Sequence, residues 1–167
     1  MHYGRITTAV GSVLAIIGLG LVSASSAAED LLPDLNAATG GAIPDGFDRV
    51  VTALWDESAA GAGIFFIALV AVLGLSLIPD IKDALSRMNA LIVTVLGVVM
   101  LVIGAVATGG AQDDADSLEA GLAAATGEAF TVSISFGWYL LAVAGVLAAI
   151  GGVLQLMARP DESALSE

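Results

Sequence analysis

The sequence predicts an all-α fold, an integral membrane four-helix bundle with short amphipathic helices in two acidic outer loops. The chain is 57% hydrophobic and 13% charged, which departs from the composition of soluble proteins. Two apolar runs, 61–78 and 88–108, contain no ionisable residue, and a helix of about 20 apolar residues crosses a hydrocarbon core of about 30 Å. The short connector between them carries Lys82 and Arg87. Short loops rich in Lys and Arg stay in the cytoplasm, so we expect an antiparallel pair of membrane spans.

The first span is expected at about residues 6–25. Its apolar run follows Arg5, a basic residue that the positive-inside rule places in the cytoplasm together with the amino terminus. Residues 1–28 also fit a cleavable secretory signal, because small residues follow the apolar run and precede a cleavage site after Ala28. The run is at the long end for a signal, which favours a retained span.

The first outer loop, residues 26–60, carries seven acidic residues and one basic residue, Arg49. The apolar residues that recur at helical spacing in its second half are Phe47, Val50, Val51 and Leu54. This spacing predicts a short amphipathic helix, with Trp55 as an interfacial anchor at headgroup depth. In the alternative, the same apolar face packs over the ends of the spans.

The second and third spans are expected at residues 61–79 and 88–108, joined by the inner connector 80–87. Pro79 does not continue the helix before it, because proline lacks the N–H that the helix needs and its ring clashes with the preceding turn. The chain therefore reverses here, and the two spans become neighbours.

The second outer loop, residues 109–131, holds acidic residues and no basic one. Asp116 and Glu119 stand at capping-box spacing, which predicts a separate short helix that ends at Gly127. Ca²⁺ and Mg²⁺ prefer carboxylate oxygens, and the candidate ligands in this loop are Asp113, Asp114, Asp116 and Glu119. The spacing of an EF-hand is missing, so we expect a solvated acidic face and no bound metal.

The fourth span is expected at residues 132–157. Trp138 and Tyr139 stand near its start, where aromatic side chains serve as interfacial anchors. Residues 158–167 form an acidic tail that is expected to be disordered in the cytoplasm. Both termini are then cytoplasmic, and the chain is expected in the cell membrane as a multi-pass protein.

The composition excludes several classes of function. A net charge of −12 argues against a nucleic-acid partner, because phosphate binding needs clustered Lys and Arg. The chain has no cysteine, so thiolate metal sites and cysteine nucleophiles are absent. The predicted spans contain no Asp, Glu, Lys, Arg or His, the groups that proton relays and ion pathways usually require. We therefore expect no enzymatic activity and no cofactor.

Small residues form stripes along three of the spans. The stripe residues are Gly11, Ala15 and Gly18 in the first span, Gly97 and Gly104 in the third, and Gly137, Ala144, Ala148 and Gly152 in the fourth. Such stripes let helix backbones approach closely in lipid. The favoured interpretation is packing within one bundle. In the alternative, one stripe, most plausibly that of the fourth span, is left for another subunit.

The layout resembles the claudin-type four-span plan. The residues that carry the resemblance are Ala53-Leu54-Trp55 at the end of a longer first outer loop and Gly137-Trp138-Tyr139-Leu140 at the start of a glycine-rich fourth span. The paired loop cysteines of that family are absent. The resemblance implies a protein that works by lateral or extracellular contacts rather than by turnover. The acid-rich, lysine-poor composition resembles that of proteins from halophilic archaea.

Two functions remain open at this point. The first is a structural or accessory membrane protein, in contact with the lipid bilayer, that associates with itself or with other membrane subunits through small-residue faces and acidic outer loops. The second is a small channel or transporter for a small uncharged solute. Its polar lining residues would be Ser76, Thr94, Ser133, Ser135 and Gln155.

Overall fold

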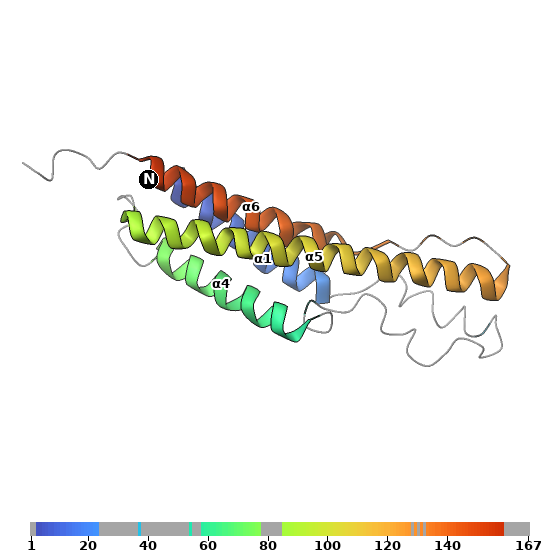
Figure 1. The fold of residues 1–167 in the computed structure, drawn as a ribbon. Helices are drawn as coiled ribbons and strands as arrows, with labels where there is room; N and C mark the ends of the chain where they lie inside the picture. Colours follow the sequence, from blue (N-terminus) through green and yellow to red (C-terminus); the bar gives the residue numbers. More distant parts are fainter. Residues whose placement is uncertain are drawn as a thin grey trace, which may run out of the picture.

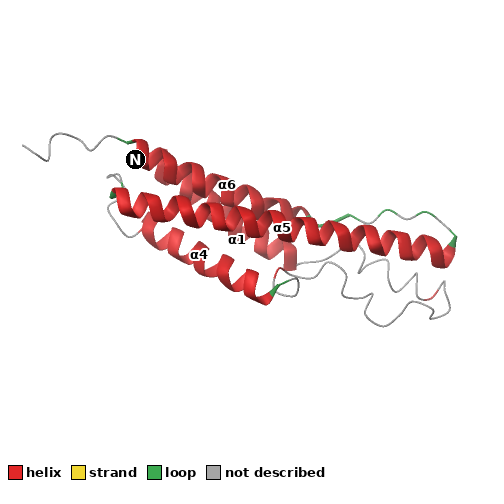
Figure 2. Ribbon diagram, in the orientation of Figure 1, coloured by secondary structure: helices red, strands yellow, loops and turns green. Residues whose placement is uncertain are grey.

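The computed structural model of the chain describes residues 3–23, 37, 54, 58–77, 85–127, 129, 131 and 133–158. The described residues form four long helices and no strand (Figures 1 and 2). The helices are α1 (Tyr3–Ser23), α4 (Ala59–Leu77), α5 (Arg87–Thr126) and α6 (Phe136–Met157). Each is long and apolar enough to cross a membrane. The expected all-α four-helix bundle is therefore confirmed.

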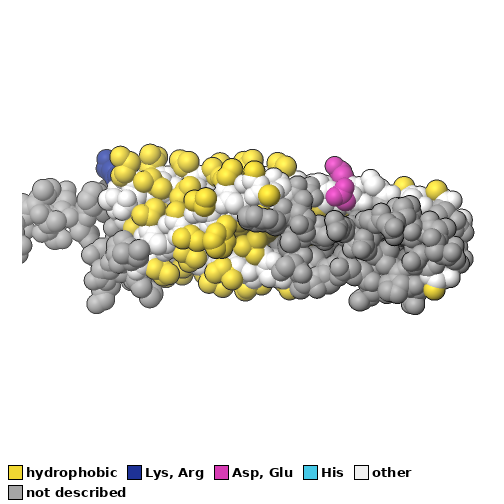
Figure 3. Space-filling view, turned by 90° about the horizontal axis from the view of Figure 1, so that it is seen from below, with side chains coloured by type: hydrophobic (Ala, Val, Ile, Leu, Met, Phe, Trp, Pro, Cys, Tyr) yellow, Lys and Arg dark blue, Asp and Glu magenta, His cyan; other side chains and the backbone are white. Residues whose placement is uncertain are grey.

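The outward faces of all four helices carry large apolar side chains. Examples are Ile17 on α1, Ile67 on α4 and Val143 on α6, all of which are exposed in the isolated chain. On the face drawn in Figure 3, apolar side chains cover the helical body, and the acidic side chains lie beyond it. A soluble monomer rarely exposes so large an apolar surface. The molecule is a multi-pass membrane protein whose apolar belt faces lipid.

Helix α6 lies between α1 and α5 and runs antiparallel to both. Gly11 of α1 faces Ala148 of α6, and Gly97 of α5 faces Ala149 of α6. Helix α4 packs against α1 and α5 with far fewer close backbone approaches between described residues. Helix α1 begins and α6 ends at one end of the bundle, which we call the terminal end (Figure 1).

Helix α5 differs from the sequence-based expectation because it is one continuous helix of 40 residues. The third span was expected to end at Thr108, with a separate short helix beginning at Asp116. Instead α5 runs on through Gly109 and into an alanine-rich stretch. No proline interrupts it, and alanine has the highest helix propensity, so the chain has no local reason to stop. The expected short helix is the last part of α5.

The end of α5 agrees with the expectation. Gly127 has a left-handed φ of 75°, and its N–H donates a hydrogen bond of 2.9 Å to the carbonyl oxygen of Ala123. Glycine adopts this conformation without steric cost. At about 1.5 Å per residue, α5 is about 60 Å long, twice the thickness of a hydrocarbon core. A hydrocarbon core can therefore cover only about half of α5, and we call the part from 109 to 126 the α5 extension.

Serine residues cap the starts of α4, α5 and α6. The Ser58 hydroxyl accepts a hydrogen bond from the N–H of Gly61, and Ser86 is the N-cap of α5. Ser135 caps α6, so this helix starts at Phe136 and not at residue 132. Serine oxygen atoms satisfy N–H groups that have no partner inside the helix.

Several sequence-based expectations fall outside the described residues. These are most of the first outer loop with its amphipathic helix and Trp55, most of the inner connector, and the acidic tail from residue 159. Leu54 is described and is buried.

Candidate functional site

The seam between α1 and α6 is built from glycines at seven-residue spacing. Gly4, Gly11 and Gly18 of α1 each face the backbone of α6. A methyl group added at Gly11 would lie 2.9 Å from the carbonyl oxygen of Ala144. Real Cβ atoms almost never come that close to a backbone atom, so any side chain here would push the two helices apart.

The seam between α5 and α6, on the other side of α6, is also built from glycines that face a neighbouring backbone. A Cβ added at Gly104 would lie 2.8 Å from the backbone nitrogen of Ala142, and one added at Gly152 would lie 2.7 Å from that of Thr94. The Thr108 hydroxyl donates its proton to two carbonyl oxygens, that of Gly104 in its own helix at 2.7 Å and that of Trp138 in α6 at 3.0 Å. Close backbone approach replaces the hydrophobic drive that lipid does not supply.

The predicted small-residue stripes are packing surfaces inside the bundle. Gly11, Ala15 and Gly18 are buried on α1, and Gly97 and Gly104 on α5. On α6 the buried stripe residues are Gly137, Ala144, Ala148 and Gly152. Because α6 uses small residues against both α1 and α5, its stripe is not left for another subunit, which corrects that alternative.

Three further glycines belong to these seams and were not singled out from the sequence. They are Gly4, Gly145 and Gly151. The signal was present in their spacing, since Gly4 precedes Gly11 by one heptad and Gly145 precedes Gly152 by one heptad. On α6, Gly151 faces α1, whereas Gly145 and Gly152 face α5, so this helix has a close neighbour on each of two sides.

The aromatic anchors divide into an exposed and a buried side chain. Tyr139 is 47% exposed, as expected of a residue at the membrane interface. Trp138 is fully buried, so its ring packs inside the bundle and does not reach lipid headgroups. The expectation of an anchor at Trp138 was therefore wrong. Its indole N–H has no acceptor among the described residues.

A group of polar side chains lies inside the bundle toward the terminal end. We call it the polar layer, and its members are Arg5, Thr8, Ser12, Ser76 and Gln155, none of them more than 2% exposed. Arg5 was expected before the first span. It instead belongs to the first turns of α1 and is buried, which places a cation inside the end of the bundle.

Hydrogen bonds satisfy part of this layer. The Thr8 hydroxyl donates to the Gly4 carbonyl oxygen at 2.9 Å, and the Ser12 hydroxyl donates to the Thr8 carbonyl oxygen at 3.0 Å. Nε2 of Gln155 donates to the Gly151 carbonyl oxygen at 3.2 Å and to Oγ1 of Thr8 at 3.5 Å. Within the described part of the chain, Oε1 of Gln155 and Oγ of Ser76 have no partner. Both atoms are shielded from solvent, so the free-energy cost of removing each from water is not offset by a hydrogen bond.

The polar residues considered for a solute path are not all brought together. Ser76 and Gln155 are in the polar layer, but Thr94 donates to the Ala90 carbonyl oxygen at 2.9 Å and is half-buried. Ser133 is exposed. Ser135 caps α6 and donates to the Leu21 carbonyl oxygen of α1 at 3.2 Å. The polar layer is at the terminal end, and Ser133 and Ser135 precede α6 at the other end. The interior between them is filled by large apolar side chains, among them Phe65, Met100 and Leu141.

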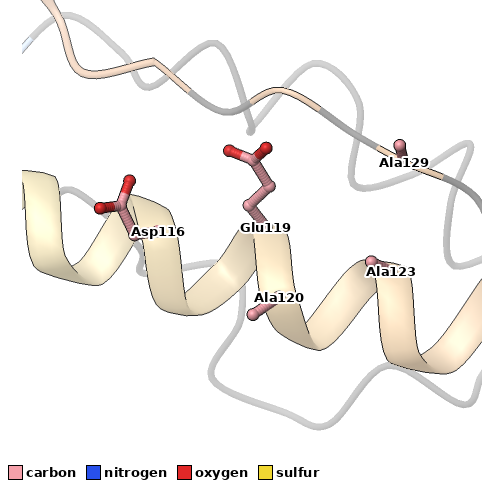
Figure 4. A pocket seen from close by; sticks show the side chains of 5 residues that line it. All are labelled: Asp116, Glu119, Ala120, Ala123 and Ala129. Atoms are coloured by element: carbon pink, nitrogen blue, oxygen red, sulfur yellow. The ribbon is translucent and has the colours of Figure 1, made fainter.

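The acidic residues of the second outer loop lie on the α5 extension. Asp116 and Glu119 line an open groove of about 410 Å³ together with Ala120, Ala123 and Ala129. Figure 4 shows both carboxylates projecting from the same side of α5. The Asp116 carboxylate accepts a hydrogen bond of 3.0 Å from Gln112.

The candidate metal ligands do not form a metal site. Asp113 and Asp114 are exposed, and Asp116 and Glu119 stand on the groove. Among the residues that the structure describes, no group of three His, Asp or Glu side chains is placed to hold an ion. The carboxylates remain a charged surface of the α5 extension.

Comparisons with family models, with curated proteins and with solved structures find no match to this chain.

Proposed function

We propose that this multi-pass membrane protein is a non-enzymatic structural or accessory protein that associates with itself or with a larger membrane complex. In this proposal both termini are cytoplasmic and the α5 extension lies outside. The positive-inside rule supports this orientation, because Lys82, Arg87 and Arg159 belong to the terminal end or its connector.

The α5 extension is the observation that carries the proposal. It is continuous with a membrane span that is held against α6 by the glycine seam. At about 1.5 Å per residue, it reaches about 27 Å past Thr108. Its exposed side chains include Asp113, Asp114 and Ser117. A rigid arm of this kind presents an acidic surface at a fixed distance from the membrane.

The interior of the bundle supports a role without turnover. In the described parts of the four spans, the only ionisable residue buried in the core is Arg5. Acid–base chemistry needs a positioned pair of groups, and nucleophilic chemistry needs a nucleophile beside a base. Helices α1, α4 and α6 and the part of α5 up to Thr108 contain no Asp, Glu, Lys or His. What the molecule offers to other molecules is surface.

The small-residue faces are occupied by packing inside the monomer, so association with other molecules must use other surfaces. We propose that the contact uses the α5 extension and the outward apolar faces, since the α1, α5 and α6 seams are already filled. The acidic outer surface then selects a partner with basic groups, by charge complementarity.

The chain has no cysteine, so a single thiol can test the proposal. The Asp114→Cys variant carries a thiol on an exposed face of the α5 extension. We expect a bifunctional thiol-to-amine reagent applied to native membranes to join it to a second copy or to another polypeptide. Ser86→Cys, exposed at the opposite end of the bundle and outside both proposed contact surfaces, is the matched control for nonspecific capture. A strict monomer in mild detergent, with no crosslinked product, would contradict the proposal, and solute flux in liposomes would favour the channel instead.

A further inference from the structure

Three helices of the bundle are held together by backbone contact, and the two α4 glycines whose surroundings are described, Gly61 and Gly63, make no such contact. Helices α1, α6 and α5 meet through glycines whose added Cβ would strike a neighbouring backbone. On α4, a Cβ at Gly61 would come no closer than 3.8 Å to a side chain of α5, and one at Gly63 would meet no described atom within 4 Å. Helix α4 buries larger side chains, Phe65 and Val72 among them. Between the described residues, α4 therefore packs through contacts of side chains and not through close approach of two backbones.

The last turn of α4 carries an uncompensated polar atom. Ser76 is 2% exposed, and its Oγ has no hydrogen-bond partner among the described residues. A serine inside a helix usually donates to the carbonyl oxygen four residues earlier, as Ser12 does in α1. In lipid an unpaired hydroxyl is costly because no water reaches it.

Other members of the polar layer stand at the same end of the bundle. Ser76 is in the last turn of α4, Gln155 is in the last turn of α6, and Thr8 is in the early part of α1. Oε1 of Gln155 also lacks a partner within the described part of the chain. Arg5 adds a buried cation. Hydration would therefore provide partners for both Oγ of Ser76 and Oε1 of Gln155.

The opposite half of the interior is built differently. Phe65, Met100, Trp138 and Leu141 are fully buried there or at mid-depth. Exposing these side chains to water would cost hydrophobic free energy. Water that enters at the terminal end should therefore stop at these side chains.

We propose that the terminal end of α4 moves away from its neighbours α1 and α5 and admits water to the buried polar side chains at that end, Ser76 on α4 and Gln155 beside Thr8. The structure is the closed state of this site. Its ligand is water, entering from the side of the membrane on which α1 begins. The large apolar side chains at mid-depth stop the water there, so the site is a blind pocket and not a channel. This inference does not depend on the proposed function.

Single cysteines in the cysteine-free chain measure the opening. Ser76→Cys nearly preserves the shape of the side chain, and its thiol reacts with water-soluble methanethiosulfonates only as a hydrated thiolate. Ala68→Cys is the matched control, since Ala68 is also buried on α4 but lies two turns deeper. In sealed vesicles we expect the Ser76→Cys thiol to react at least about tenfold faster than the Ala68→Cys thiol, because local opening exposes only the end of α4. The reaction should require reagent on the side of the terminal end.

Equal and slow rates at the two positions, in protein that elutes and melts as the wild type does, would overturn the proposal. Fast reaction at both positions would also overturn it, because the pocket would then not be blind. Hydrogen exchange of the wild-type protein in nanodiscs gives a second measurement that needs no substitution. Amides of residues 72–77 should exchange at least about tenfold faster than those of residues 145–150 of α6, and equal protection would count against the opening.

Discussion

Gly104 and Gly63 are both helical glycines inside the membrane, but only one of them has a neighbour. A Cβ at Gly104 would lie 2.8 Å from the backbone nitrogen of Ala142, whereas one at Gly63 would meet no described atom within 4 Å. The difference lies in the partner helix and not in the glycine itself. At this scale the sequence shows which residues are small, but not which of them touch another backbone.

Replacing Gly104 by Ala should therefore destabilise the bundle. The added methyl group meets backbone that cannot rotate away, so α5 and α6 must separate, at a cost of about 1–3 kcal/mol. Thermal unfolding in mild detergent measures the change. The matched control Gly63→Ala should be neutral or should raise stability by up to about 1 kcal/mol, because alanine is the better helix former. Equal losses for both variants would show that the seam is not the cause.

Ser76→Ala should raise the stability of the closed bundle. The substitution removes a buried hydroxyl that has no partner among the described residues, and such an atom costs about 1–3 kcal/mol. Ser12→Ala is the control, because the Ser12 hydroxyl donates to the Thr8 carbonyl oxygen at 3.0 Å and its loss should not stabilise. Denaturation of both variants in the same detergent compares them. A loss of stability in Ser76→Ala would mean that the hydroxyl has a partner in solution.

At the scale of elements, α5 shows where sequence reasoning fails and why. The last exposed large apolar side chain described on α5 is Val106, close to Thr108, where the third span was expected to end. The helix itself continues to Thr126. Hydropathy reports the surroundings of a helix, whereas alanine propensity decides whether the helix continues. Capping-box spacing at Asp116 was misleading because the same two residue types also occur inside helices.

The continuity of α5 gives a distance that can be measured. Spin labels on Leu91→Cys and Asp114→Cys, both exposed positions of α5, should lie about 35 Å apart along a straight helix with a narrow distribution. Double electron–electron resonance in nanodiscs reports this distance. A flexible break at Gly109 would shorten the mean distance and broaden it.

At the scale of the whole molecule, the sequence was sufficient for the class of fold and insufficient for its internal contacts. Length and the absence of charge predicted four membrane helices, and the structure has four that are long and apolar enough. The partner of each small-residue face could not be predicted, because helices of equal hydropathy can be arranged in several orders. The burial of Trp138 depends on the rotation of α6, which only its two neighbours determine.

The orientation of the whole molecule is a further prediction. With basic residues inside, an impermeant thiol reagent should label Asp114→Cys in intact cells, because Asp114 is exposed on the α5 extension. Ser86→Cys, exposed just before α5 at the opposite end, should react only after the cells are opened. The reverse pattern would show that the termini face outward.

The hydroxyl of Ser135 bonds to the last turn of α1 while capping the start of α6, and the α1 glycines find their only close backbone contacts, among described residues, on α6. Ribosomes make a chain from its amino end, so α1 is delivered to the bilayer long before the helix that completes it is synthesised. Until then the side of α1 that bears Thr8 and Ser12 has no α6 beside it. Assembly of this protein is therefore finished only by its last span, and a polypeptide interrupted after α5 would contain three inserted helices without either of the glycine seams.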